Sequence, residues 1–269
     1  MRKSDFIPPV VGKLLSRYNI FRLYGWFGNY SSWEEALKRS KGYDAAPIVE
    51  KVKNAILKVK NGETAYERDS VLFDHVEYSW PLLASLLWVA AQKDGRLNVL
   101  DFGGSLGSTY FQNRKFYEGL KSIKWNIVEQ EHFVDCGKRF FENDELKFYR
   151  TLEDCMREQQ PSIVLFSCVL QYLEKPYKII EKAFQFNPEF IIVDNMPFQK
   201  KGNDRITVQK VHPSIYEASY PCWFLDKSVF LDFFKNRYTM VADFKSDLFI
   251  KVDGDIIPYE GFIFKKYKS

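Results

Sequence analysis

The chain has 269 residues, of which 46% are hydrophobic and 28% are charged. This length and composition are typical of a globular protein with one large core, or with one core and a smaller cap. The formal net charge is only +4, and the sequence contains no long basic run. We therefore do not expect a nucleic acid as its partner.

The cysteines and the apolar runs indicate the cellular compartment of the protein. Its four cysteines form no CxxC pair and no regular framework, which is typical of free thiols in a reducing compartment. No apolar run is long enough to cross a membrane, and the first residues lack an unbroken signal-peptide core. We expect a cytoplasmic protein.

Residues 1–95 carry helical periodicity and almost no strand signal, so we expect an N-terminal helical region. Its first segment, residues 10–21, has an apolar face beside Lys13 and Arg17. That face could make a peripheral contact with an anionic membrane surface, but packing against the body of the protein is the favoured alternative.

Three further helices are expected in this region, over residues 31–42, 46–62 and 74–95. Ser31 or Ser32 is suited to cap the first of them, and Gly62 to end the second. The third is apolar all round, which predicts a buried helix.

From residue 96 to residue 269 the pattern changes to short apolar runs with amphipathic helical segments between most of the earlier ones. The runs are LNVLDF, KWNIVEQ, LKFY, SIVLFSCV, FIIVDNM, YTMVADF and GFIFKKY. Alternating β and α units predict a Rossmann-like α/β fold with a mostly parallel, seven-stranded sheet. The last two runs are separated only by an expected loop, which predicts an antiparallel strand at the C-terminal end.

Residues 198–224 have no long helical pattern, and we expect a loop insertion there. Loops of this length in a compact domain are usually functional or disordered, and the aromatic residues of this one argue against disorder.

The stretch NVLDFGGSLGSTYF places Gly103, Gly104 and Gly107 between an expected strand and an expected helix. Such a turn lets a ligand approach the backbone closely at the carboxyl end of the strand. A tight turn without a ligand is an equally good interpretation of the glycines alone. Their spacing differs from the G-x-G-x-x-G pattern that binds NAD.

Two acidic residues narrow the expected ligand. Asp101 stands two residues before the first glycine, and Glu129 ends the second apolar run, with Gln130 beside it. A carboxylate at the position of Glu129 can accept hydrogen bonds from both hydroxyls of a ribose. These residues favour an adenosine-type cofactor.

Asp101-Phe-Gly-Gly-Ser-Leu-Gly107 resembles motif I of the class I S-adenosylmethionine-dependent methyltransferases, with Ser105 in place of the central glycine. The resemblance implies S-adenosyl-L-methionine as cofactor, bound by Asp101, the three glycines, Glu129 and Gln130. It also implies that Ser167 and Cys168, at the end of the fourth run, line the cofactor site.

Longer segments, among them FGNYSSWEEA, VLQYLEKP and VDNMPF, resemble a narrower methyltransferase family associated with bacterial surface-polysaccharide loci. That resemblance covers most of the chain. It implies methyl transfer, and it leaves the acceptor open.

Methyl transfer from a sulfonium needs positioning and, for a hydroxyl acceptor, a base. The candidate bases are Asp194, at the end of the fifth run, and His212; a cap on the following turn is an equally good interpretation of Asp194. Ser167 and Cys168 stand where a metal-assisted enzyme would need carboxylates, so we expect no metal.

The acceptor-binding candidates are Tyr78, Arg205, Gln209, Tyr216 and Tyr220. A guanidinium suits planar anions, and aromatic faces suit sugars. The sequence therefore predicts a metal-independent methyltransferase that acts on a hydroxyl of a saccharide or related polar metabolite in surface-polysaccharide biosynthesis. The alternatives are an NAD-linked oxidoreductase that uses Glu129 and a non-catalytic partner protein with a methyltransferase fold; the oligomeric state is open.

Overall fold

A computed structural model of the chain describes residues 24–42, 45–68, 71–73, 78–199, 202–213, 215 and 217–267. The segment 10–21, for which the sequence suggests a membrane contact, lies outside the described residues, as does Tyr216.

Within the described part of the chain, the central sheet contains the seven predicted strands. In spatial order they are β6 (Leu146–Tyr149), β5 (Ser122–Val128), β4 (Arg96–Phe102), β7 (Ile163–Ser167), β8 (Phe190–Gln199), β12 (Asp255–Lys266) and β11 (Tyr238–Val252). The first five are parallel to one another, and β12 runs antiparallel to β8 and β11. The predicted Rossmann-like fold with an antiparallel C-terminal strand is confirmed.

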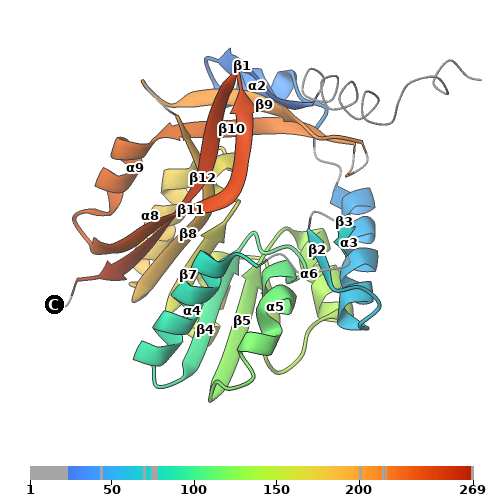
Figure 1. The fold of residues 1–269 in the computed structure, drawn as a ribbon, viewed down its shortest axis with the longest axis vertical. Coiled ribbons are helices and arrows are strands. Elements are labelled where there is room, and N and C mark those ends of the chain that lie inside the picture. Colours follow the sequence, from blue (N-terminus) through green and yellow to red (C-terminus); the bar gives the residue numbers. More distant parts are fainter. Residues whose placement is uncertain are drawn as a thin grey trace, which may run out of the picture.

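Helices cover both faces of this sheet (Figure 1). They are α4 (Trp80–Gln92), α5 (Ser108–Asn113), α6 (Glu131–Phe140), α7 (Leu152–Gln159), α8 (Pro176–Gln185) and α9 (Lys227–Phe234), with short 3-10 turns at η2 (Arg114–Phe116) and η3 (Leu170–Tyr172). Successive residues of a strand point to opposite faces. Val99 thus packs in the core on the α4 side, and Leu100 packs in the core on the α7 and α8 side. Continuous apolar strands are what a sheet buried on both faces requires.

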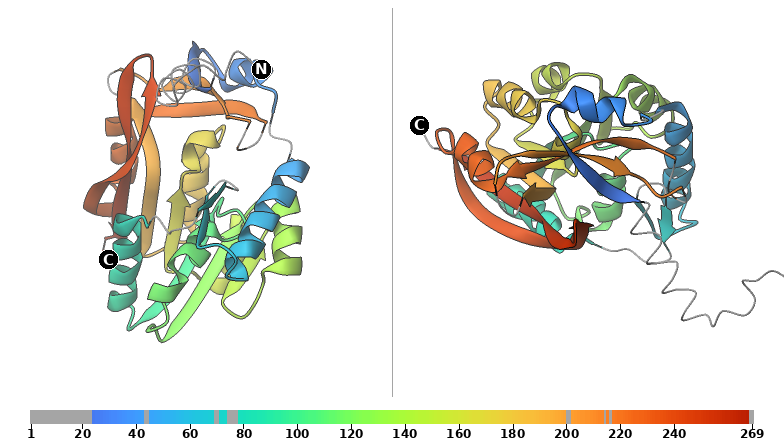
Figure 2. Two further views of the ribbon diagram at one scale, coloured as in Figure 1. Left: turned by 45° about the vertical axis from the view of Figure 1, so that its right-hand side comes forward. Right: turned by 90° about the horizontal axis from the view of Figure 1, so that it is seen from above.

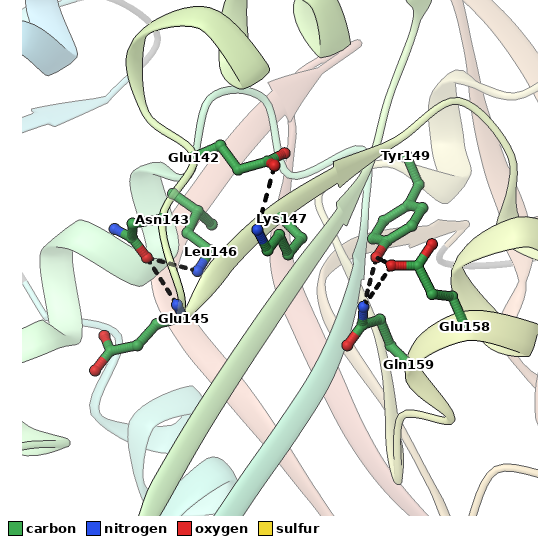
Figure 3. Close-up of polar contacts among 8 residues, drawn as sticks. All are labelled: Glu142, Asn143, Glu145, Leu146, Lys147, Tyr149, Glu158 and Gln159. Atoms are coloured by element: carbon green, nitrogen blue, oxygen red, sulfur yellow. Dashed lines mark hydrogen bonds and ion pairs between the residues drawn. The ribbon is translucent and has the colours of Figure 1, made fainter.

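Strand β6 lies at the edge of the sheet and is anchored at both ends (Figure 3). Before it, Asn143 Oδ1 accepts from the backbone N–H groups of Glu145 and Leu146, at 2.8 and 2.9 Å. After it, Tyr149 donates to Glu158 at 2.7 Å and accepts from Gln159 at 2.6 Å. These contacts fix the loops on either side of a short strand that pairs on one side only.

Three more strands form a layer over the carboxyl ends of the central strands (Figures 1 and 2). They are β1 (Gly25–Tyr30), β9 (Arg205–Lys210) and β10 (Ser219–Asp226), in antiparallel order β1-β9-β10. The layer joins the central sheet where Leu225 and Asp226 of β10 pair in parallel with the upper end of β8. We call it the upper layer.

The upper layer corrects two expectations. Residues 198–224 contain strands β9 and β10 in place of the predicted loop, and the N-terminal region contributes β1 to the same layer. The expected loop between the last two strands is also wrong, because β11 and β12 form one long hairpin with a turn at Asp253 and Gly254.

The remaining N-terminal elements are α2 (Trp33–Lys38), α3 (Ala45–Lys60) and the short hairpin of β2 (Tyr66–Arg68) and β3 (Val71–Phe73). The predicted helices are confirmed as α2, α3 and α4, and Ser32 caps α2 by accepting from the backbone N–H of Glu35 at 3.1 Å. The strands β2 and β3 were not predicted. Helix α3 and this hairpin stand at the side of the space between the central sheet and the upper layer (Figure 2).

Among the described residues, no helix is both long enough and apolar enough to cross a membrane.

Candidate functional site

A cavity of about 1720 Å³ lies at the carboxyl ends of the central strands, below the upper layer. Its lining comes from the loops after β4, β5, β6, β7 and β8, from β2 and the start of α4, and from β1, β9 and β10. Small-molecule pockets commonly measure about 300 to 1,000 Å³. The cavity is therefore larger than a pocket for one small molecule needs to be.

The glycine loop after β4 forms one wall. Gly103 and Gly107 have φ of +74° and +99°, in the region that favours glycine. A Cβ on Gly103 would lie 2.5 Å from Val169, and one on Gly104 would lie 2.5 Å from the Asp101 carboxyl. Gly103, Gly104 and Ser105 line the cavity, whereas Gly107 forms the turn into α5.

Asp101 lies beneath this loop and is only 1% exposed. Its Oδ2 accepts from the indole N–H of Trp125 at 3.0 Å. Burial raises the pKa of Asp101 to about 7, a rise that the Trp125 hydrogen bond opposes. Asp101 lies close to Gly104 and also lines the cavity, so its predicted contact with a cofactor stays a prediction.

Glu129 follows β5 and faces the same loop. Its Oε2 accepts from the backbone N–H of Gln130 at 2.7 Å. Burial raises the pKa of its carboxyl, and the hydrogen bonds from the backbone N–H groups of Gln130 and Ser105 oppose that rise. Glu129 and Gln130 both line the cavity, and their predicted contacts with the cofactor stay predictions.

The ends of β7 and β8 bring Ser167, Cys168 and Asp194 together. The Ser167 hydroxyl and the Asn195 amide both donate to Asp194 Oδ2, each at 2.8 Å. Only 1% of the surface of Asp194 is exposed, and the residue still lines the cavity.

The backbone at these ends is strained. Cys168 and Asn195 have φ of +51° and +53°, which non-glycine residues rarely adopt. Ser105, in the facing glycine loop, has φ of +55°. Strained residues persist where the surrounding structure imposes them, and they cluster at ligand sites. These three positions all line the one cavity.

The upper layer provides an aromatic and amide wall. Trp26 of β1, Gln209 of β9 and Tyr220 of β10 line the cavity together with Tyr172 and Tyr259. The rings of Tyr172 and Tyr220 meet edge to face, with centroids 5.2 Å apart. Gln209 Oε1 and Asn195 Oδ1 are buried without a hydrogen-bond partner among the described residues.

Another part of the cavity wall is formed by β2 and by the beginnings of α4 and α5. Its lining residues include Glu67, Tyr78, Trp80 and Ser108. Glu67 is 2% exposed and accepts a hydrogen bond from the Ser108 hydroxyl. Tyr78 thus lines the cavity, and its predicted contact with an acceptor stays a prediction.

Besides Gly107, two other predicted residues are not part of the cavity wall. The His212 ring packs edge-on against Tyr24, with centroids 4.7 Å apart, and does not line the cavity. Arg205 donates to Gly28 O at 3.0 and 2.6 Å and forms an ion pair with Asp253 at 2.6 Å. Arg205 thus joins β9 to β1 and to the tip of the long hairpin, in place of the acceptor contact that its sequence position suggested.

Several cavity residues were not singled out from the sequence. Trp26, Asn195 and Tyr259 lie on or beside strands whose partners are distant in the sequence. Asn195 directly follows the candidate base Asp194, which is a signal that the sequence did offer. The sequence offered no such signal for Trp26 and Tyr259, because no local sequence pattern shows that their strands lie at the cavity.

Within the described part of the chain, no three or more His, Cys, Asp or Glu side chains are grouped so that they could hold a metal ion.

No protein-family model matches the chain, and no curated protein matches it either. Solved structures do match the chain. The N-terminal domain of EvdMO1, crystallised with S-adenosylhomocysteine and D-fucose, has a TM-score of 0.47 at 13% identity and covers 81% of this chain and 97% of its own. The 1,6-didemethyltoxoflavin-N1-methyltransferase of Burkholderia thailandensis has a TM-score of 0.43 at 13% identity, covering 85% and 93%.

An S-adenosylmethionine-dependent methyltransferase of Methanosarcina mazei has a TM-score of 0.50 at 11% identity and covers 71% of this chain and 99% of its own. The chain has the class I methyltransferase fold. At this identity the likeness concerns the fold alone, so the activity has to be argued from the cavity.

Proposed function

We propose that the protein is an S-adenosylmethionine-dependent methyltransferase that methylates a hydroxyl group of a small polar molecule. One observation supports this most strongly. The strained glycine loop, the ribose-type carboxylate Glu129 and the strand-end carboxylate Asp194 line a single cavity at the carboxyl edge of a class I methyltransferase sheet.

The residues present fit this cofactor. Gly103 and Gly104 pack too closely against Val169 and Asp101 to carry a Cβ, and the loop that they form lines the cavity. Glu129 can accept from ribose hydroxyls, and Gln130, Ser167 and Cys168 line the adjoining surface. When bound, the cofactor would supply a methyl group on a sulfonium, already activated for transfer.

Asp194 is the proposed base. The Ser167 and Asn195 hydrogen bonds hold its carboxylate in one orientation at the end of β8. A hydroxyl acceptor bound beside it would pass its proton to Asp194 as the oxygen gains the methyl group. We propose that this occurs without a metal ion, because proton removal and positioning are sufficient for an activated donor.

The acceptor that we propose is a saccharide or a related polar metabolite of surface-polysaccharide biosynthesis. The wall of Trp26, Gln209 and Tyr220 supports a ring-shaped, hydroxyl-bearing acceptor, because aromatic faces pack against such rings and amides bond their hydroxyls. The buried, unpartnered oxygens of Gln209 and Asn195 favour a ligand with hydrogen-bond donors.

Titration calorimetry tests the cofactor. We expect the protein to bind S-adenosylhomocysteine, and Glu129→Gln to weaken that binding by about 1 to 3 kcal/mol, because hydrogen-bonding groups lose their partner. Glu118→Gln, which changes an exposed acid, is the matched control and should bind as the wild type does. Binding of NADH in place of S-adenosylhomocysteine would contradict the proposal and favour an oxidoreductase.

A transfer assay tests the base. With labelled S-adenosylmethionine and a mixture of nucleotide-linked sugars and glycan precursors, the wild type should label a small or glycan-like product. Asp194→Asn keeps the shape of the side chain and removes the base, so label transfer should fall by about 100-fold or more while S-adenosylhomocysteine affinity is retained. Full activity of the folded variant would exclude Asp194 as the base, and label in protein or RNA would exclude the saccharide acceptor.

A further inference from the structure

We propose that two copies of the chain pair along strand β11, antiparallel and about a two-fold axis at Phe244. Strand β11 lies at one edge of the central sheet, and β6 lies at the other. Among the described residues, β11 pairs with β12 alone. Its outer side therefore presents backbone N–H and C=O groups with which a second strand can pair.

The two edges of the sheet differ in length and exposure. Proteins commonly keep edge strands short, because a long exposed edge pairs readily with another chain. Strand β6 has four residues, of which three are buried. Strand β11 has 15 residues, and residues 239–243 are exposed in succession. The edge at β11 is thus the one suited to an interface.

Large apolar side chains are exposed on both sides of Phe244 along this strand. Met240 and Val241, before it, are 44% and 42% exposed, and Leu248 and Phe249, after it, are 36% and 58% exposed. A two-fold axis at Phe244 places the residues before it in one copy against the residues after it in the other. Apolar side chains then meet at both ends of the interface. Leu248 also lines the cavity, so the second copy would border the candidate site.

The charges beside Phe244 are complementary in the same arrangement. Asp243 and Lys245 are two residues apart on the strand and so point to the same face of the sheet. Neither has an ion pair among the described residues; Glu260, the residue opposite Lys245 on β12, pairs with Lys227 at 2.5 Å. The two-fold axis sets Asp243 of each copy directly opposite Lys245 of the other. Opposite charges in such cross-strand pairs are stabilising.

The shape of β11 limits the pairing to its middle. Its register with β12 is irregular both before Ala242 and after Lys245. Between these points Phe244 lies over Gly261, where a Cβ on the glycine would collide with the phenylalanine ring. Bulges turn an edge away from a long ladder, so regular pairing is confined to residues 242–245. The apolar contacts on either side of this segment supply the rest of the interface.

Analytical ultracentrifugation of the full chain tests the pairing. We expect a reversible dimer whose population rises with protein concentration. Asp243→Lys sets like charges opposite each other at both symmetry-related contacts, so the dimer Kd should rise by about tenfold or more. Lys245→Asp should raise it similarly. The two substitutions together exchange the charges and should return the Kd toward its wild-type value.

Matched controls lie elsewhere on the surface. Asp144→Lys makes the same change of charge beside β6, at the opposite edge of the sheet, and should leave the dimer Kd unchanged. Phe249→Ser should weaken the dimer, whereas Leu37→Ser, at a 51% exposed leucine of α2, should not. Thermal unfolding reports whether each variant folds. If Asp243→Lys does not, Lys245→Asp carries the test, because it creates the same like-charge contact from the other side.

A wild-type protein that stays monomeric up to about 1 mM would overturn the proposal. A dimer whose Kd is unchanged by the folded Asp243→Lys or Lys245→Asp variants would overturn it too, because its interface would lie elsewhere. So would a double variant that dimerises no better than either single one. None of these outcomes affects the proposed methyl transfer, which the binding of S-adenosylhomocysteine tests separately.

Discussion

Ser105 stands where the methyltransferase loop pattern has its central glycine, and its backbone shows why glycine is usual there. Its φ of +55° lies in the left-handed region, between Gly103 at +74° and Gly107 at +99°. A serine can adopt this conformation at a modest energetic cost. The substitution therefore leaves the path of the loop intact, and the departure from the motif is no argument against a ligand at this position.

Asp101 is the residue whose environment has the clearest consequence for stability. Its pKa is raised to about 7 in the folded protein, mainly by burial, whereas an unfolded aspartate titrates near 3.9. The folded state therefore holds this proton more tightly than the unfolded state. The contribution to stability is fully present below about pH 4 and is lost as the pH rises through 7.

Replacing Asp101 with asparagine removes this titration and can keep the Trp125 hydrogen bond. Relative to the wild type, Asp101→Asn should gain stability between pH 5 and pH 8, by about 2 to 3 kcal/mol. Urea unfolding of the ligand-free protein at the two pH values measures the change. Asp144→Asn, at an exposed position, is the control and should show none. If the free energies of unfolding of the wild type and Asp101→Asn differed by the same amount at both pH values, the raised pKa of Asp101 would be contradicted.

At the scale of elements, the seven central strands could be predicted because each carries its own pattern. Runs such as SIVLFS are apolar at successive positions, as strands buried on both faces require, and β7 is buried along almost its whole length. The glycine loop and Glu129 follow two of these runs directly. Their meeting at one edge follows from the parallel order of the sheet.

The upper layer could not be predicted in the same way. Strand β10 contains Pro221, which usually argues against a strand, and pairs with β9 across a connection of eight residues, 211–218. Strand β1 pairs with β9, which lies about 180 residues later. Such pairing depends on tertiary contacts that the local hydrophobic periodicity of the sequence does not indicate. For this reason Arg205 was assigned to an acceptor, although it contacts the protein itself.

Arg205 joins three parts of the chain, so its loss should loosen the upper layer before it affects the central sheet. Its guanidinium bonds Gly28 O and pairs with Asp253, and its side chain is only 16% exposed. Arg205→Ala should destabilise the layer by about 1 to 3 kcal/mol, because these partners lose a charged donor. Hydrogen exchange should accelerate in β1 and at the hairpin tip, while β4 and β5 stay protected.

Arg157→Ala, which removes an exposed arginine 3.8 Å from Asp154, is the matched control and should leave exchange in the upper layer unchanged. Uniform acceleration across the whole protein in Arg205→Ala would show that the layer and the central sheet unfold as one unit.

At the scale of the whole molecule, the cavity has two walls of different origin. The lower wall consists of loops from the central sheet, and the upper wall consists of β1, β9 and β10. The cavity of about 1720 Å³ exceeds the space that one small ligand needs. Under the proposed function, the lower wall would bind the cofactor and the upper wall would bind the acceptor.

Hydrogen exchange with S-adenosylhomocysteine can show whether the walls are used separately. The ligand should stabilise the protein by about 2.7 kcal/mol at 100 times its Kd, because it binds the folded state only. Protection should increase in the glycine loop and after β5, where the proposed contacts lie. Strands β9 and β10 should exchange as in the free protein until an acceptor is added. Increased protection of Gln209 and Tyr220 by S-adenosylhomocysteine alone would instead make the upper layer a cover for the cofactor, and the acceptor would then have to enter beside it.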